Sequence, residues 1–299
     1  MFEIMALTKR HIRKFLRDKA AVFTSLLTVI ILLALYFLFI GKQYVSNIQG
    51  LDEALRTQLL IGVMMGGILV INTLSLSLGV MGNLVVDIDQ KKIESFLVTP
   101  VKRYKIILSY YASAILVTSV LTVFMWGLTV LYAGLFANHW YRFDTILNVS
   151  LLIIGFTFIS TAIMVFLTSL IRSVNAFGTL SGVLGTLVGF MSGIYMPLVQ
   201  LGDGMIKVAS LNPYTHMSIV MKRVLLDRPL EELLKRMMTN PNLADPFREV
   251  ESIRVIYGAK EIGIWGQSVS MGWIFTVIAG ITMLFLYLAY RNMNRQLSK

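Results

Sequence analysis

The residue types that carry most enzyme chemistry are scarce in this sequence. It contains no cysteine and only three histidines, His11, His139 and His216, so we expect neither a thiolate site nor a clustered histidine metal site. It also lacks the GxxxxGK[ST] loop that cradles nucleotide phosphates. We therefore expect a chain that is not an enzyme and holds no cofactor of its own.

Long stretches of the chain carry no Asp, Glu, Lys or Arg, and His139 is the one histidine within them, near a predicted membrane surface. Six runs are free of Asp, Glu, Lys and Arg: 20–41, 57–86, 106–141, 145–171, 173–202 and 262–290. Ion-coupled carriers usually hold a buried ionisable group within their spans, so a secondary carrier is disfavoured. The polar residues that remain, such as Asn72 and Ser75 in the second run, can bond neighbouring helices or line a weakly polar path.

These runs define the fold class. The chain is 56% apolar and 14% charged, whereas soluble domains carry about 25% charged residues. Each run is long enough for one crossing, because a helix needs about 20 apolar residues to span a bilayer, and a segment in lipid must satisfy its own backbone hydrogen bonds. The sequence therefore predicts an all-α polytopic membrane protein with six transmembrane helices, forming a single domain over residues 1–299.

The net charge of +11 is concentrated on one side of the predicted topology. With the N-terminus inside, the inner segments 1–19, 87–105, Arg172 and 291–299 hold 15 Lys and Arg against five acidic residues. This is the positive-inside pattern, which predicts a multi-pass protein of the cell (cytoplasmic) membrane with both termini cytoplasmic. It also explains the basic composition without a nucleic-acid partner.

Three segments outside the runs have recognisable patterns. Residues 1–19 separate an apolar stripe from basic residues, which favours an amphipathic interface helix on the inner leaflet over a merely basic topology signal. Residues 203–261 form a long extracellular segment, in which a short helix is expected just before Asn240.

Residues 87–105 form a cytoplasmic segment where Ile93, Phe96 and Leu97 share one helical face and Pro100 ends the helix. This pattern is suited to docking in a partner's groove.

The fifth run is rich in glycine at a spacing that allows close helix packing. GxxxG spacings connect Gly178 with Gly182, and Gly185 with Gly189 and Gly193. Such glycines let membrane helices approach closely. Packing within the chain and a contact between two chains both remain open at this point.

Two motifs resemble type-two ABC exporter permeases. After their second span these permeases carry an acidic pair and a Thr-Leu-Glu-x-Leu-Leu-x-Thr-Pro-like stretch with a basic tail. After their fifth span they carry Ser-Gly-x-x-x-Pro, a re-entrant external helix and Leu-Asn-Pro. The corresponding residues here are Asp87 and Asp89, then Ile93-Glu94-Ser95-Phe96-Leu97-Val98-Thr99-Pro100, then Ser192-Gly193-Ile194-Tyr195-Met196-Pro197, and Leu211-Asn212-Pro213. Lys91 and Lys92 stand where the family has Gly-Thr.

The resemblance implies a function and partners. It implies the permease subunit of an ABC exporter, active as a homodimer or as a heterodimer with a similar permease. A separate ABC ATPase subunit would bind ATP and magnesium and would move a coupling helix within residues 87–105. The residues implied in ATPase coupling are Asp87, Asp89, Ile93, Glu94, Phe96, Leu97, Thr99 and Pro100. Those expected along the translocation path or in its packing are Asn72, Ser75, Gly182, Gly185, Gly189 and Gly193, and those of the external re-entrant motif are Pro197, Asn212 and Pro213.

The cargo and one rival function follow from the same features. A largely apolar interior favours a hydrophobic or amphipathic substrate, such as a drug, an antimicrobial peptide or a lipid. The alternative is an ATP-independent membrane scaffold or receptor that binds a ligand through residues 203–261.

Overall fold

The computed structural model describes residues 2–20, 22–24, 27, 30–31, 52–93, 101–136, 139–239, 245–265, 267 and 269–296. Within these ranges the regular structure is helical, apart from one isolated bridge between Ile264 and Gln267, so the all-α prediction is confirmed. The helices are α1 (Phe2–Arg17), α4 (Glu53–Asp89), α6 (Arg103–Phe136), α7 (Phe143–Ser169), α8 (Val174–Met191), η2 (Leu198–Gln200), α9 (Gly202–Ala209), α10 (Pro213–Met238), α11 (Pro246–Ile256) and α12 (Met271–Gln296).

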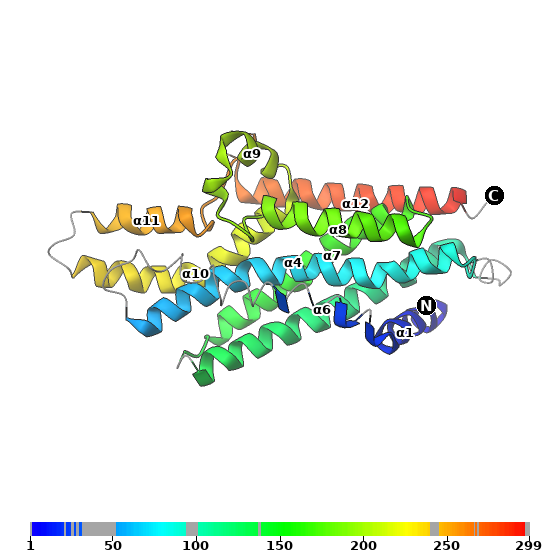
Figure 1. Ribbon diagram of the computed structural model, residues 1–299, viewed down its shortest axis with the longest axis horizontal. Helices are drawn as coiled ribbons and strands as arrows, with labels where there is room; N and C mark the ends of the chain where they lie inside the picture. Colours follow the sequence, from blue (N-terminus) through cyan, green and yellow to red (C-terminus); the bar gives the residue numbers. More distant parts are fainter. Residues whose placement is uncertain are drawn as a thin grey trace.

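Five of these helices are long and apolar enough to cross a membrane, namely α4, α6, α7, α8 and α12. Each coincides with a run that lacks charged residues, as the sequence predicts. The first run, 20–41, lies largely outside the described residues. The helix α1 lies at one end of the molecule, and α4 begins at the other (Figure 1); the sixth predicted span stays a prediction.

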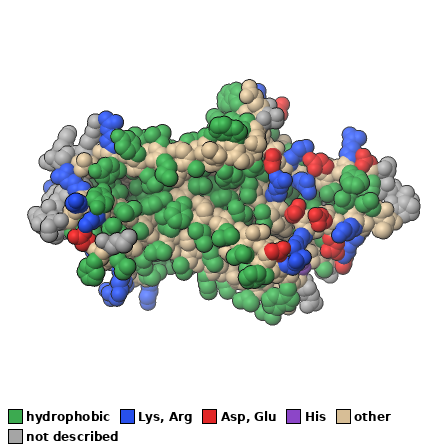
Figure 2. All heavy atoms as spheres, turned by 180° about the vertical axis from the view of Figure 1, so that it is seen from behind, with side chains coloured by type: hydrophobic (Ala, Val, Ile, Leu, Met, Phe, Trp, Pro, Cys, Tyr) green, Lys and Arg blue, Asp and Glu red, His purple; other side chains and the backbone are tan. Residues whose placement is uncertain are grey.

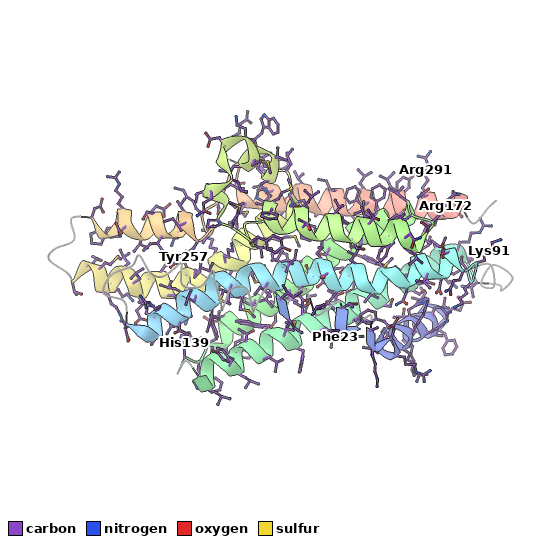
Figure 3. The ribbon with its side chains drawn as sticks, in the orientation of Figure 1. Phe23, Lys91, His139, Arg172, Tyr257 and Arg291 are labelled. Carbon is purple, nitrogen blue, oxygen red and sulfur yellow. The ribbon has the colours of Figure 1, made fainter. Side chains whose placement is uncertain are left out.

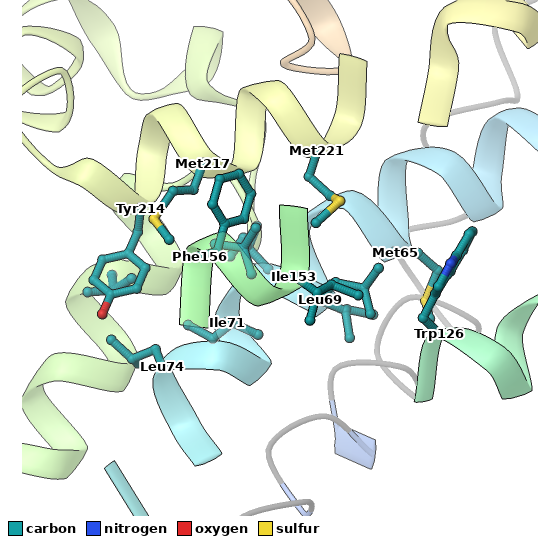
Figure 4. Close-up of a cluster of buried hydrophobic side chains, with 14 of the residues drawn as sticks. Met65, Leu69, Ile71, Leu74, Trp126, Ile153, Phe156, Tyr214, Met217 and Met221 are labelled. Carbon is teal, nitrogen blue, oxygen red and sulfur yellow. The ribbon is translucent and has the colours of Figure 1, made fainter. Parts of the chain in front are cut away.

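The helix α4 is the centre of the bundle. It packs against α6, α7, α8 and α10, and 89% of an apolar stretch of 18 residues within it is buried. A helix that is apolar on all sides belongs either in a protein core or in lipid, and α4 is covered mainly by protein. Its side chains Met65 and Leu69 meet Ile153 and Phe156 of α7 and Met221 of α10 in one hydrophobic core (Figure 4).

The helix α8 is shorter than the run that predicts it. It ends at Met191, after 18 residues, or about 27 Å at 1.5 Å per residue. Gly193 follows with a φ of +64°, a left-handed conformation that favours glycine and ends helices. The chain then turns through Pro197, which precedes η2, so one charge-free run supplies a span and the start of the turn that follows it.

The helix α10 is longer than the external helix expected near its end. The expected end before Asn240 matches Met238, but the helix begins at Pro213. Its first half packs along the outer half of α4, where Leu226 contacts Gly62 and Lys222 contacts Gly66. The segment 203–261 is therefore partly built into the bundle.

The surface is organised along the long axis of the molecule. On the face shown in Figure 2, hydrophobic side chains cover the middle, and charged side chains gather toward both ends. Lys91, Arg172 and Arg291 lie at the end that also holds both termini, whereas His139 and Tyr257 lie toward the other end (Figures 1 and 3). We call the end with both termini the terminal end, and the end with α10 and α11 the opposite end.

Candidate functional site

Asp87 joins three helices at the terminal end of the bundle. Its carboxylate is fully buried and accepts hydrogen bonds from Lys14 Nζ and Tyr110 OH, both at 2.6 Å. The guanidinium of Arg10 lies 3.7 Å from the same carboxylate. Because Lys14 and Arg10 belong to α1 and Tyr110 belongs to α6, one carboxylate at the end of α4 holds both neighbours in place.

His11 completes this clamp on the inner side of α1. Its ring stacks on Tyr110 with centroids 3.7 Å apart, and its Nε2 lies 3.2 Å from Ser109 Oγ. Since Ser109 Oγ donates to the Ile106 carbonyl, His11 Nε2 donates to Ser109 Oγ. His11 Nδ1 lies 3.5 Å from Arg10 Nη1, where it accepts as in a neutral imidazole. Burial lowers the pKa of His11 to about 4, and the charge of Arg10 acts in the same direction.

The residues expected in ATPase coupling separate into three groups. Asp87 and Ile93 are buried, and Ile93 N donates to the Asp87 carbonyl, so both belong to the base of the segment. Asp89 is exposed. The remaining five, Glu94, Phe96, Leu97, Thr99 and Pro100, lie outside the described residues.

The polar residues of α4 bond within the bundle. Asn72 is buried, and its Nδ2 donates to Thr122 Oγ1 of α6 at 3.1 Å. Thr73 Oγ1 lies 2.8 Å from Ser160 Oγ of α7, so α4 is bonded to both neighbours at one level. Ser75 is half-buried. A role for Asn72 or Ser75 in a translocation path stays a prediction.

The glycines of α8 fall into two classes. A side chain added at Gly189 would lie 2.1 Å from the Tyr195 ring, and one added at Gly193 would lie 2.7 Å from Leu198. Those two glycines are needed for packing within the chain. Gly182 and Gly185 would meet nothing within 4 Å, so packing among the described residues does not require them to be glycine.

The external motif positions the start of α10. Asn212 is the N-cap of α10 and its side chain accepts a hydrogen bond from Tyr214 N at 3.1 Å, while Pro213 occupies the first helical turn. Both residue types are favoured at these positions. Pro197 precedes η2 on the opposite side of the same turn, so the three motif residues shape the backbone.

Lys222, the basic residue that follows the Leu211-Asn212-Pro213 motif, is a cation whose burial the sequence does not predict. It is 1% exposed, and its Nζ donates to the Gly193 carbonyl at 2.8 Å. Its stem packs on Gly66, where an added Cβ would lie 2.4 Å from Lys222 Cγ. Helical spacing in the sequence does not reveal this burial, because Ser218, four residues before Lys222, is itself polar.

Among the described residues no group of three or more His, Cys, Asp or Glu side chains could hold a metal ion. The geometry instead consists of a clamped terminal end, a continuous apolar span bundle and a structured turn at the opposite end. Apolar helices of this length with charged residues at their two ends are typical of a membrane protein.

The comparison with protein families agrees with this geometry. The family model described as "ABC-2 type transporter" matches residues 2–225 of the 299-residue chain, and the chain belongs to this family. No curated protein matches the chain. It is therefore a multi-pass membrane protein and a permease component of an ABC transporter, a class that works with an ABC ATPase subunit and is generally not catalytic itself.

Proposed function

We propose that this chain is the permease of an ABC exporter, and that it acts in the cell membrane as a homodimer or as a heterodimer with a similar permease. The segment 87–105 lies in the cytoplasm and docks on the ATPase, which supplies ATP and magnesium. The observation that carries the proposal is the Asp87 clamp, because it gives the segment a rigid base tied to α1, α4 and α6. Movement of a docked segment would then be transmitted to three helices at once.

The proposed partner permease faces α8. Only 11% of the 18 residues of α8 are buried. Its exposed surface combines Val183 and Leu187 with glycines such as Gly182 and Gly185, which have no neighbour within 4 Å. The similarly exposed α12 also has open glycines, but it presents more large side chains, including Trp273, Met283 and Tyr287. Small residues allow backbones to approach closely, so the surface of α8 suits a second chain and that of α12 suits lipid.

The proposed cargo is hydrophobic or amphipathic, such as a drug, an antimicrobial peptide or a lipid. Support comes from the apolar surface of the spans and from the bonding of Asn72, Thr73 and Ser77 to neighbouring helices. Side chains bonded in this way offer few groups to a polar cargo. Residues along the path are proposed on α8, at Gly182 and Gly185, and on α4, at Ser75.

Co-purification tests the coupling proposal. We expect Phe96→Asp to weaken association with the partner ATPase, because it places a charge in an apolar socket of the partner. Phe143→Asp is the matched control, since Phe143 is exposed at the opposite end, in the first turn of α7. Wild-type recovery of the ATPase with Phe96→Asp would contradict the proposal.

The cargo is tested with the assembled complex. Compounds from the three proposed classes are added to the permease–ATPase complex in lipid, and the rate of ATP hydrolysis is measured. Stimulation by amphipathic compounds is expected. Stimulation by polysaccharide alone would contradict the proposed cargo.

A further inference from the structure

An apolar groove runs between α7 and α12 on the outside of the bundle. It consists of two neighbouring cavities of about 510 and 330 Å³ that share Ile159 in their walls. Two walls come from residues 151–163 of α7 and residues 271–285 of α12. The third comes from the segment 210–224, which includes the first half of α10, together with Ile264. We call these two cavities together the α7–α12 groove. Its wall residues Leu151, Val277 and Ile281 are exposed, so the groove opens sideways from the bundle.

The dimensions of the α7–α12 groove match one leaflet of a bilayer. At 1.5 Å per residue, its walls extend about 18 Å along α7 and about 21 Å along α12. One leaflet of the hydrocarbon core is about 15 Å thick, half of the full value. Because these two walls are span helices, the groove runs along them and suits an extended hydrocarbon chain.

One end of the groove is charged. Arg223 of α10 borders the larger cavity, and its side chain is 54% exposed and paired with Glu261. The larger cavity is lined by the first part of α7 and of α12, on the side of the opposite end. A guanidinium carries five N–H donors, so the pair with Glu261 leaves donors for a phosphate.

The polar side chains in the smaller cavity are hydrogen-bonded to the protein, except that Nδ1 of His216 has no partner among the described residues. Ser210 Oγ donates to the Lys207 carbonyl and accepts from Trp265 N. His216 Nε2 lies 2.7 Å from the Ser210 carbonyl, to which it donates. The groove therefore combines an apolar channel with a cation at one end, which is the complement of an anionic headgroup on an acyl chain.

We propose that the α7–α12 groove holds a phospholipid of the leaflet at the opposite end, with one acyl chain in the groove and the phosphate on Arg223. The lipid is retained by the permease and is distinct from the exported cargo. The proposal needs only that the spans lie in a membrane, so it does not depend on export or on ATPase docking.

The test compares variants that fill the groove with variants that fill open surface. A side chain added at Gly155 of the groove, or at Gly280 on the exposed face of α12, meets nothing within 4 Å. Wild type, Gly155→Trp and Gly280→Trp are purified without the ATPase from nanodiscs of phosphatidylethanolamine and phosphatidylglycerol. Retained phospholipid is then counted by native mass spectrometry. Gly155→Leu replaces Gly155→Trp if the larger side chain yields no monodisperse protein.

We expect wild type and Gly280→Trp to retain one phospholipid per chain more than Gly155→Trp. Apparent affinity should fall about tenfold or more in Gly155→Trp, the loss expected when about two methylene groups are excluded. Equal retention by all three proteins would overturn the proposal. A change of oligomeric mass without a change of lipid count would also overturn it, because the groove would then be an interface between chains.

The headgroup is tested separately with Arg223→Gln. We expect phospholipid affinity to fall about tenfold or more, as for the loss of a charge-assisted hydrogen bond, and binding of a diacylglycerol with the same chains to be unchanged. Arg254→Gln is the control, because Arg254 is a part-exposed arginine of α11 that pairs with Glu251. Equal losses for both lipids, or no loss for either, would overturn the role of Arg223.

Discussion

Asp87 and Asp89 are two residues apart in sequence, yet they have different roles in the structure. The Asp87 carboxylate is buried and bonds two neighbouring helices, whereas Asp89 is exposed. Removing the charge of a buried carboxylate leaves its partners without their acceptor. Of the two acidic residues in the family motif, Asp87 therefore stabilises the fold, whereas Asp89 is on the surface.

We expect Asp87→Asn to lower the stability of the permease by about 2 kcal/mol, since charged hydrogen bonds contribute about 1.5–3 kcal/mol each and Lys14 can regain water. Asp89→Asn is the matched control and should change stability by less than about 0.5 kcal/mol. Thermal unfolding of both purified variants in the same lipid measures the difference. Equal stability of the two variants would show that the clamp contributes nothing.

The buried His11 predicts a pH dependence of the same clamp. Its pKa falls from 6.5 to about 4 on folding, so protons bind the unfolded form more readily. The free energy of unfolding therefore has its full value above about pH 6.5, where His11 is neutral in both states. It decreases as the pH falls toward 4. At pH 5 the loss is about 2 kcal/mol, and thermal unfolding between pH 7.5 and pH 5 measures it.

The control for this prediction is His11→Phe, which keeps an aromatic ring against Tyr110 and has no group that titrates. The variant should lose less stability than wild type between pH 7.5 and pH 5. An identical pH profile in the two proteins would assign the titration to another residue.

At the scale of elements, the bundle uses glycine to let helices meet closely. Gly62 and Gly66 of α4 receive Leu226 and Lys222 of α10, where an added Cβ would lie 2.6 and 2.4 Å from the nearest side-chain atom. The GxxxG spacing in α4 therefore serves packing within one chain. On α8 the same type of spacing includes Gly182 and Gly185, which face open space.

This difference predicts which glycines matter for assembly. We expect Gly182→Ile to weaken the proposed dimer by about tenfold or more, because a branched side chain separates the helices and about 1.4 kcal/mol suffices for that change. Fluorescence energy transfer between two labelled populations in lipid vesicles measures the association. Gly127→Ile on α6 is the control, since Gly127 also has nothing within 4 Å. Unchanged association of Gly182→Ile would remove α8 from the dimer interface.

The whole molecule has a hydrophobic middle and two charged ends, which differ in composition. Lys91, Arg172 and Arg291 lie at the terminal end, whereas the opposite end carries ion pairs such as Arg228–Asp144 and Lys260–Glu251. A basic excess next to the membrane marks the cytoplasmic side. The terminal end is therefore the proposed cytoplasmic end.

The absence of cysteine from the sequence makes this orientation directly testable. We expect Arg248→Cys on α11 to react with an impermeant maleimide in right-side-out vesicles, and Arg172→Cys to react only after the membrane is opened. Both positions are exposed, so a difference in labelling reports the side of the membrane. The reverse pattern would place the termini outside.

The sequence by itself determined which segments leave water. Runs without charged residues predict the spans because a bilayer excludes ionised groups and unpaired backbone, and the five described spans follow those runs. The helical residues 2–17 and the end of α10 at Met238 were also readable, because helical periodicity is a local property. The start of α10 at Pro213 was not predicted. The two motifs, in residues 87–100 and 192–213, were enough to indicate the family.

The tertiary structure alone decided which faces meet. The burial of Lys222 against Gly66, the bonding of Asp87 to α1 and α6, and the division of the glycines of α8 all depend on contacts between distant residues. The α7–α12 groove likewise exists only where two helices and part of a third come together. Hydrophobicity fixes that a segment is buried, but the neighbour that covers each face is set by side-chain packing across the whole bundle.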